Sequence, residues 1–269
     1  MKIILYSVFV CLIAALSFSS CKKDNYSEPH ETLKGRVVDA STEELVLTDQ
    51  GSEGTRIRLR ELSWAETLVS DNFDFYCMKE GIFQNTKLFE GHYNVRIDGA
   101  FIPLLRKSST GDTLADETKY IDIKGVTEVE FKVQPFLKLE WIGQPTVSGG
   151  KITATVKVTR AVSPEDFREK IEPMGNYNDN MLNVTDVRLF VSEVPYVGYR
   201  DWDNRYSTEI DFSGNSFDAK LGQPFTITTQ GTIPSGRTVF IRAAARINYA
   251  TENIRRHNYN AAIRVDIPN

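Results

Sequence analysis

The sequence predicts an all-β protein built from two tandem β-sandwiches. Apolar and polar residues alternate with a period of two in one segment after another, and Gly, Pro, Asn and Asp separate those segments. Long helical patterns are almost absent. Strands with one apolar and one polar face are typical of antiparallel sandwiches. The roughly 240 residues that follow the N-terminal leader are enough for two cores of ordinary size.

The first twenty residues have the pattern of a secretory signal. Lys2 precedes an apolar run over residues 3–16, and the small residues Ser19 and Ser20 come directly before Cys21. The run is too short for a stable membrane-spanning helix. The residues before Cys21 resemble the lipobox of bacterial lipoproteins, in which this cysteine is acylated and the chain is cut before it. The alternative is an ordinary secreted protein in which Cys21 is free.

The net charge argues against one class of partner, and the cysteine content argues against an intrachain disulfide. Without Lys2, the mature chain has 31 Lys and Arg against 36 Asp and Glu, a net charge of −5. This mildly acidic balance argues against a nucleic-acid partner, which requires a basic surface. Cys11 leaves with the signal and Cys21 is the predicted lipid attachment site, so Cys77 remains without a disulfide partner. We expect Cys77 to be a buried, small apolar residue.

The predicted strands follow in order, and one helix interrupts them. Each strand has apolar residues at every second position; the clearest are 55–62, 91–99, 127–135, 151–160, 186–194 and 238–249. The segment 163–172 is predicted to be helical, because Ser163 can cap it, Pro164 suits its first turn, and acidic residues follow.

The domain boundary is predicted near Pro135, which ends one strand before Phe136 begins another. Trp141 shares a face with apolar neighbours in this second strand, so we expect it in a core rather than on a ligand platform. The predicted organisation is a signal peptide, a polar tether and two sandwiches, at residues 1–20, 21–31, 32–134 and 136–269.

Several motifs resemble a known pair of domains. The segments "LKGRVVDASTEEL" (33–45) and "DFYCMKEGIFQNTKLFEGHYNV" (74–95) resemble the prealbumin-like sandwich, also called transthyretin-like or carboxypeptidase-regulatory-like. Its hairpin motif corresponds here to Glu80, Gly81, Phe83, Leu88, Gly91, Tyr93 and Val95. The segments "VRLFVSEVPYVG" (187–198) and "HNYNAAIRVDI" (257–267) resemble the immunoglobulin-like second half of the Bacteroidetes lipoprotein family called domain of unknown function 3823.

This resemblance implies a cellular location and a biological role for the protein. Members of the family are typically encoded in polysaccharide-utilisation loci, beside outer-membrane receptors and glycan-binding lipoproteins. The resemblance therefore implies a lipid-anchored outer-membrane protein, on the cell surface in preference to the periplasmic face, that helps to capture or present glycan. The side of the membrane stays open, because "CKKDN" (21–25) has one Asp where a strongly acidic run often directs export.

The segment "VPYVGYRDWDNRYSTE" (194–209), which we call the aromatic loop, is the first candidate binding site. Pro and Gly break the strand alternation there, so we expect a loop between strands. Aromatic faces can cover the C–H face of a sugar ring, and interleaved polar residues can bind its hydroxyls. The candidate ligand-binding residues are Tyr196, Tyr199, Arg200, Trp202, Asp203 and Tyr206. The alternative is that these rings pack internally or on the neighbouring domain.

Trp64 is a second candidate platform, with a packing role as its alternative. The arginines of 56–60 could bind an acidic group, or they could pair with acidic residues of a neighbouring strand. Asp201 and Asp203 offer too few oxygens to predict a calcium site. We predict no metal and no cofactor.

No catalytic motif is present in the sequence: it contains no His-Glu-x-x-His, Gly-x-Ser-x-Gly, phosphate-binding Gly loop or Cys-x-x-Cys. Together with the aromatic loop on a lipid-anchored pair of sandwiches and with what the family resemblance implies, this favours a non-catalytic lipoprotein that binds polysaccharide or oligosaccharide, or helps to present it. The alternative is a structural or accessory subunit that docks on an outer-membrane receptor or another lipoprotein.

Overall fold

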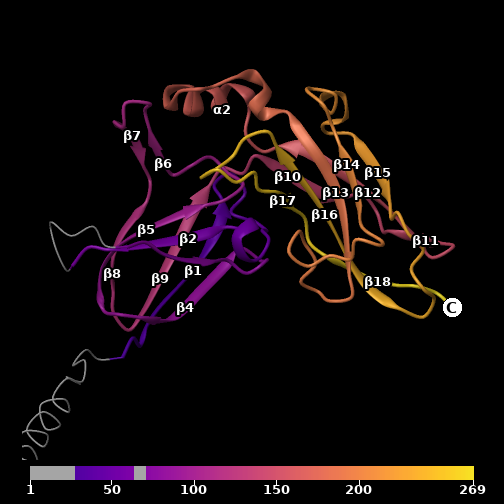
Figure 1. Ribbon diagram of the computed structural model, residues 1–269, viewed down its shortest axis with the longest axis horizontal. Helices are drawn as coiled ribbons and strands as arrows, with labels where there is room; N and C mark the ends of the chain where they lie inside the picture. The colour runs from indigo at the N-terminus through magenta and orange to yellow at the C-terminus, as the bar shows by residue number, and fades with distance from the viewer. Residues whose placement is uncertain (1–27, 64–70) are drawn as a thin grey trace, which may run out of the picture.

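The computed structural model describes residues 28–63 and 71–269, and these residues form β-sandwiches that lie side by side (Figure 1). The predicted all-β fold class is confirmed. Strands up to β9 form one group of sheets, and strands from β10 onward form the other. The change from one group to the other falls between Val133 and Leu137.

The first sandwich has two main sheets and a hairpin. In one sheet, β1 lies between β4, which is antiparallel to it, and β9, which is parallel to it. The other sheet has the order β3-β2-β5-β8, and β6 pairs with β7. The strands are β1 (Glu31–Asp39), β2 (Arg56–Glu61), β3 (Phe73–Tyr76), β4 (Ile82–Leu88), β5 (Gly91–Asp98), β6 (Leu105–Lys107), β7 (Thr113–Asp116), β8 (Lys119–Ile123) and β9 (Val126–Val133), with the 3-10 helix η1 (Gly51–Glu53) before β2.

The second sandwich is antiparallel throughout its described pairs. One sheet has the order β10-β12-β11, with β15 also on β12; the other has the order β14-β13-β16-β17, with β18 also on β16. The strands are β10 (Leu137–Trp141), β11 (Thr146–Ser148), β12 (Lys151–Arg160), β13 (Val184–Ser192), β14 (Thr208–Asp211), β15 (Pro224–Thr228), β16 (Thr238–Ile247), β17 (Asn258–Tyr259) and β18 (Ile263–Asp266).

The predicted helix is present as α2 (Pro164–Ile171), and Figure 1 shows it along one edge of the molecule. The Ser163 side chain accepts a hydrogen bond from the backbone N–H of Asp166 at 3.0 Å, as expected of an N-cap. Phe167 and Ile171 point into the second core. Short 3-10 helices follow at η2 (Glu172–Met174), η3 (Asp179–Leu182) and η4 (Asp218–Lys220). Among the described residues, no helix has the length and apolar character needed to cross a membrane.

Apolar side chains of facing sheets form the cores. Cys77 is 3% exposed in the core of the first sandwich, which confirms the expected burial. Trp141 packs against the clusters of the second sandwich, and its indole N–H donates to the carbonyl of Ala261 at 2.8 Å. The expected packing role of Trp141 is therefore confirmed.

Candidate functional site

The aromatic loop joins β13 to β14, as predicted, and β14 begins within it at Thr208. Its turn is closed by two backbone hydrogen bonds: Gly198 N–H donates to the carbonyl of Asp201 at 3.1 Å, and Asp201 N–H donates to the carbonyl of Gly198 at 3.2 Å. Val197 is fully buried in a small cluster against which Leu47 of the first sandwich packs. The loop therefore lies at the junction of the two sandwiches.

Two rings of the loop lie on the outer face of the β13–β16 sheet. Tyr199 stacks on His257 with the ring centroids 5.6 Å apart, and the guanidinium of Arg188 lies 5.1 Å from the Tyr199 centroid. Trp202 meets Phe190 edge to face at 5.8 Å and keeps 37% of its surface exposed. One part of the Trp202 ring system is thus fixed by packing while another part faces solvent.

Tyr196 lies at the other end of the turn and is 52% exposed. Lys79 of the first sandwich donates a hydrogen bond to the carbonyl of Pro195 at 2.7 Å and lies 5.6 Å from the Tyr196 ring centroid. The first sandwich therefore supplies a cation beside the most exposed ring of the loop.

The remaining candidates are less closely grouped. Arg200 is exposed, whereas Asp203 accepts hydrogen bonds from Arg205 and is partly buried. Tyr206 packs against the second core under Arg205, whose guanidinium is 5.0 Å from the ring centroid. Among the described residues, Tyr206 makes no ring contact with Trp202 or Tyr199. The structure thus places Tyr196, Arg200 and Trp202 at the surface of one loop.

Two sequence candidates, Cys21 and Trp64, lie outside the described residues. For the arginines of β2, the sequence allows either binding of an acidic group or pairing with acidic residues of a neighbouring strand. Arg58 donates to both oxygens of Asp74 at 2.7 Å, and Arg56 donates to Asp98 at 2.7 Å. Both also face Glu252 of the second sandwich. Pairing with neighbouring acidic residues therefore accounts for these two arginines.

A buried carboxylate that the sequence did not single out holds the loop. Asp49 is 1% exposed and precedes η1 of the first sandwich. Its Oδ2 accepts hydrogen bonds from the backbone N–H of Arg200 at 3.0 Å and from the Tyr259 hydroxyl at 3.1 Å. Burial and the Asp49 charge raise the pKa of Tyr259 well above its ordinary value, so Tyr259 keeps the proton that it donates.

Arg242 is a second buried residue that the sequence did not single out. It is 1% exposed, and its guanidinium lies 4.3 Å from the centroid of the Tyr259 ring. It donates to the carbonyls of Asn260 at 2.8 Å and Thr48 at 2.9 Å, with longer bonds to Lys79 and Val197. Arg242 lies opposite the apolar face of β16. The alternation of apolar residues along this strand therefore indicates a side chain that faces solvent. Contacts with Tyr259 and Asn260 of its own sandwich and with Thr48 and Lys79 of the first sandwich bury it.

A network of buried hydrogen bonds and ion pairs holds His257, the ring on which Tyr199 stacks. Asp186 Oδ1 is 2.8 Å from His257 Nε2, and its Oδ2 accepts from Arg246 Nε at 2.6 Å. Burial alone would raise the pKa of Asp186, but hydrogen bonds from His257 and Arg246 and the charge of Arg246 outweigh it and lower this pKa well below its ordinary range. Burial lowers the pKa of His257 despite the Asp186 contact. We therefore describe the pair as an ionised Asp186 and a neutral His257.

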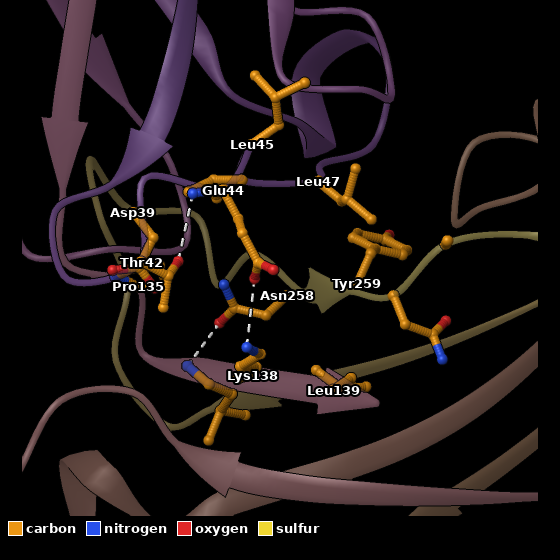
Figure 2. A pocket seen from close by; sticks show the side chains of 14 residues that line it. Asp39, Thr42, Glu44, Leu45, Leu47, Pro135, Lys138, Leu139, Asn258 and Tyr259 are labelled. Carbon is orange, nitrogen blue, oxygen red and sulfur yellow. Dashed lines mark hydrogen bonds and ion pairs between the residues drawn. The ribbon is translucent and has the colours of Figure 1, made fainter. Parts of the chain in front are cut away.

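A crevice between the sandwiches lies beside this junction (Figure 2). Segment 39–47 of the first sandwich forms one wall, β10 forms another, and Asn258 and Tyr259 lie between them. Lys138 pairs with Glu44 across it at 3.3 Å. Its volume of about 130 Å³ is below the roughly 300–1,000 Å³ of small-molecule sites. The crevice is therefore part of the junction rather than a pocket for a sugar.

A larger cavity, of about 480 Å³, lies at one end of the first sandwich between Leu59, Phe73 and Phe89. Its rim includes Glu61 and Asp71, which flank residues that the structure does not describe, and no site is assigned to it. Within residues 28–63 and 71–269, no group of three or more His, Cys, Asp and Glu side chains could hold a metal ion.

Comparison with solved structures identifies relatives. A DUF3823 family protein from Bacteroides uniformis is 56% identical; the match covers 89% of this chain and all of that one, with a TM-score of 0.86. A second B. uniformis protein, described as a "putative carbohydrate binding protein", is 18% identical with a TM-score of 0.62 over 89% of this chain and all of that one. A DUF3823 family protein from Parabacteroides merdae is 14% identical with a TM-score of 0.60 over the same shares of the two chains.

No family model matches the chain, and no curated protein matches it. The two relatives below 25% identity show a shared fold. The relative at 56% identity, matched over its full length, shows membership of a family as well as a shared fold. On that likeness, the chain belongs to the DUF3823 family.

Proposed function

We propose that this protein is a non-catalytic, lipid-anchored outer-membrane protein that binds glycan, or helps to present it, through the aromatic loop. The observation that carries the proposal is the exposure of Trp202 and Tyr196 on a loop whose backbone is held by both sandwiches. Because contact with Phe190 already restrains Trp202, the exposed part of its ring can stack on a sugar with a smaller loss of side-chain freedom on binding. Arg200 and Asp201, both exposed, provide hydrogen-bonding groups between the rings.

The fold shared with the B. uniformis protein described as a "putative carbohydrate binding protein" supports a glycan-related role. The sequence pattern before Cys21 supports attachment to a membrane by acyl chains, each of which contributes about 0.8 kcal/mol per buried CH₂. Labelled palmitate should appear on the wild-type chain and not on Cys21→Ala. Release of Cys21→Ala into the soluble fraction would support the anchor, and unchanged membrane binding would refute it.

Affinity electrophoresis through gels containing different polysaccharides tests the glycan proposal. We expect at least one polysaccharide to retard the mature chain, and we expect Trp202→Ala to weaken retention by about tenfold, equivalent to about 1.4 kcal/mol. Tyr120→Ala is the matched control, since Tyr120 is a 58% exposed aromatic residue on β8 of the first sandwich. Failure of every polysaccharide to retard the wild-type chain would contradict the proposal, as would equal retention of Trp202→Ala.

A second candidate function is docking on an outer-membrane receptor or another lipoprotein. Val194 is 41% exposed beside Tyr196, and neighbouring apolar and aromatic groups also suit a protein interface. A protein that co-purifies from membranes with the wild-type chain but not with Trp202→Ala, without retention by any polysaccharide, would favour this function over glycan binding.

A further inference from the structure

The geometry points to Asp49 as a positioning residue: a carboxylate of the first sandwich sets the shape of the aromatic loop of the second, so that the exposed surface of Tyr196, Arg200 and Trp202 forms only when the sandwiches are docked. The inference rests on the proposed function for the use of that surface. The positioning itself depends only on contacts within the chain.

Asp49 contacts the loop at its turn. Its Oδ2 accepts the N–H of Arg200, and its Oδ1 accepts the N–H of Gln50 at 2.8 Å, which fixes the carboxylate on its own sandwich. Asp49 is buried, and a loop that moved away would leave Oδ2 without its Arg200 partner. The Tyr259 hydroxyl would remain as a partner of Oδ2, but each hydrogen bond that a buried carboxylate accepts stabilises it, so Asp49 favours the loop conformation that supplies the Arg200 N–H.

Gly198 shows how closely the two groups pack. A Cβ at this position would lie 2.6 Å from Asp49 Oδ1 and 3.0 Å from Asp49 Cγ. The φ angle of Gly198 is outside the left-handed region, so its backbone conformation is open to alanine. Glycine is therefore required at position 198 by the carboxylate of the other sandwich and not by the turn.

Two more side chains at the junction, Lys79 of the first sandwich and Arg242 of the second, contact the same loop. Lys79 holds the carbonyl of Pro195 on one side of the turn. Arg242 links the carbonyl of Val197 to that of Thr48, the residue before Asp49. The turn between Pro195 and Arg200 is thus held across the junction by Lys79 and Asp49, and Arg242 ties Val197 of the same turn to the residue before Asp49.

The test uses the mature chain labelled with 5-fluorotryptophan, which reports the environment of the three tryptophans by fluorine NMR. Loss of one signal in Trp202→Phe assigns Trp202. We expect Asp49→Asn to shift the Trp202 signal, to leave the Trp141 signal in place and to weaken retention by a bound polysaccharide about fivefold or more. Glu252→Gln is the matched control, since it weakens ion pairs across the junction, with Arg56 and Arg96, that do not involve the loop. It should leave the Trp202 signal unchanged.

Gly198→Ala supplies the second variant and decides the matter if Asp49→Asn does not fold. We expect Gly198→Ala to shift the Trp202 signal in the wild-type background. In Asp49→Ala the oxygen that the new Cβ would meet is gone, so adding Gly198→Ala should produce little further shift. The inference is overturned if the Trp202 signal does not move in Asp49→Asn and Gly198→Ala. It is also overturned if the shifts caused by Asp49→Ala and Gly198→Ala simply add in the double variant. If the signals move as expected but no polysaccharide retards the wild-type chain, the proposed glycan function fails and the positioning role stands.

Discussion

At the scale of single residues, Cys77 shows how burial decides chemistry. It directly follows β3 and is 3% exposed, and burial raises the pKa of its thiol well above the ordinary value. Cysteine reacts as the thiolate, so the folded protein should present little reactive sulfur at Cys77. Apolar packing is therefore its role in this fold.

We predict that Cys77 in a Cys21→Ser mature chain reacts with a thiol reagent at least about a hundredfold more slowly in buffer than in denaturant. Ser109→Cys provides an exposed comparison in the turn between β6 and β7 and should react at once. Rapid reaction of Cys77 in the folded chain would show that its surroundings open readily.

At the scale of elements, Asp186 joins two strands and the segment before a third. Its carboxylate on β13 bonds Arg246 of β16 and His257, which precedes β17. His257 also supports the ring of Tyr199 from the aromatic loop. The pair therefore couples the outer face of this sheet to the candidate site.

The lowered pKa of His257 gives a pH dependence with a definite sign. The neutral form is favoured in the fold, so its stabilisation is present above the unfolded pKa of about 6.5 and is lost as the pH falls through that value toward the folded pKa. Asp186, also with a lowered pKa, loses its contribution at still lower pH, below the unfolded value of about 3.9.

We expect the melting temperature to fall between pH 7 and pH 5 in the wild-type chain and to fall less in His257→Gln. Replacing His92, an exposed histidine on β5, by Gln should keep most of the wild-type pH dependence. Equal pH profiles for the wild-type chain and His257→Gln would refute this assignment.

At the scale of the whole molecule, the sandwiches share buried polar contacts. Arg242 bonds Thr48 across the junction, and Arg256 of the second sandwich donates to the carbonyl of Gly54 at 2.9 Å. The Thr251 hydroxyl donates to the carbonyl of Gly99 at 2.7 Å. These carbonyl groups are shielded from water when the sandwiches are docked. A partial separation of the sandwiches would therefore leave the carbonyl oxygens without hydrogen-bond donors. The two sandwiches should therefore unfold together.

We predict one calorimetric transition for the mature wild-type chain. Arg242→Met removes the donors that four carbonyls share and should lower the transition by several degrees, since about 1 kcal/mol corresponds to roughly 2–4 °C in a chain of this size. It should also separate the transition into two. Arg264→Met, an exposed substitution on β18, should change little. Two wild-type transitions that Arg242→Met leaves in place would contradict the prediction.

Much of the fold could be predicted from sequence because it depends on neighbours along the chain. Alternation placed the strand at residues 151–160 at the observed bounds of β12, and Ser163 with Pro164 placed the start of α2. The aromatic loop was also predictable as a loop, because Pro195 and Gly198 break the alternation. The parallel pairing of β1 with β9 was not predicted, since alternation gives no strand partners.

The sequence by itself determined the all-β class, the strand positions, the capped helix and the loop that carries the candidate rings. Only the tertiary structure decided which rings stay exposed and which groups hold them. Asp49 and Arg200 are 151 positions apart, and Arg242 has the alternation pattern of a solvated residue. The period-two pattern of a sequence indicates which residues share a face of one strand. The partner of a buried charge depends instead on which distant segment of the chain covers the face that carries the charge.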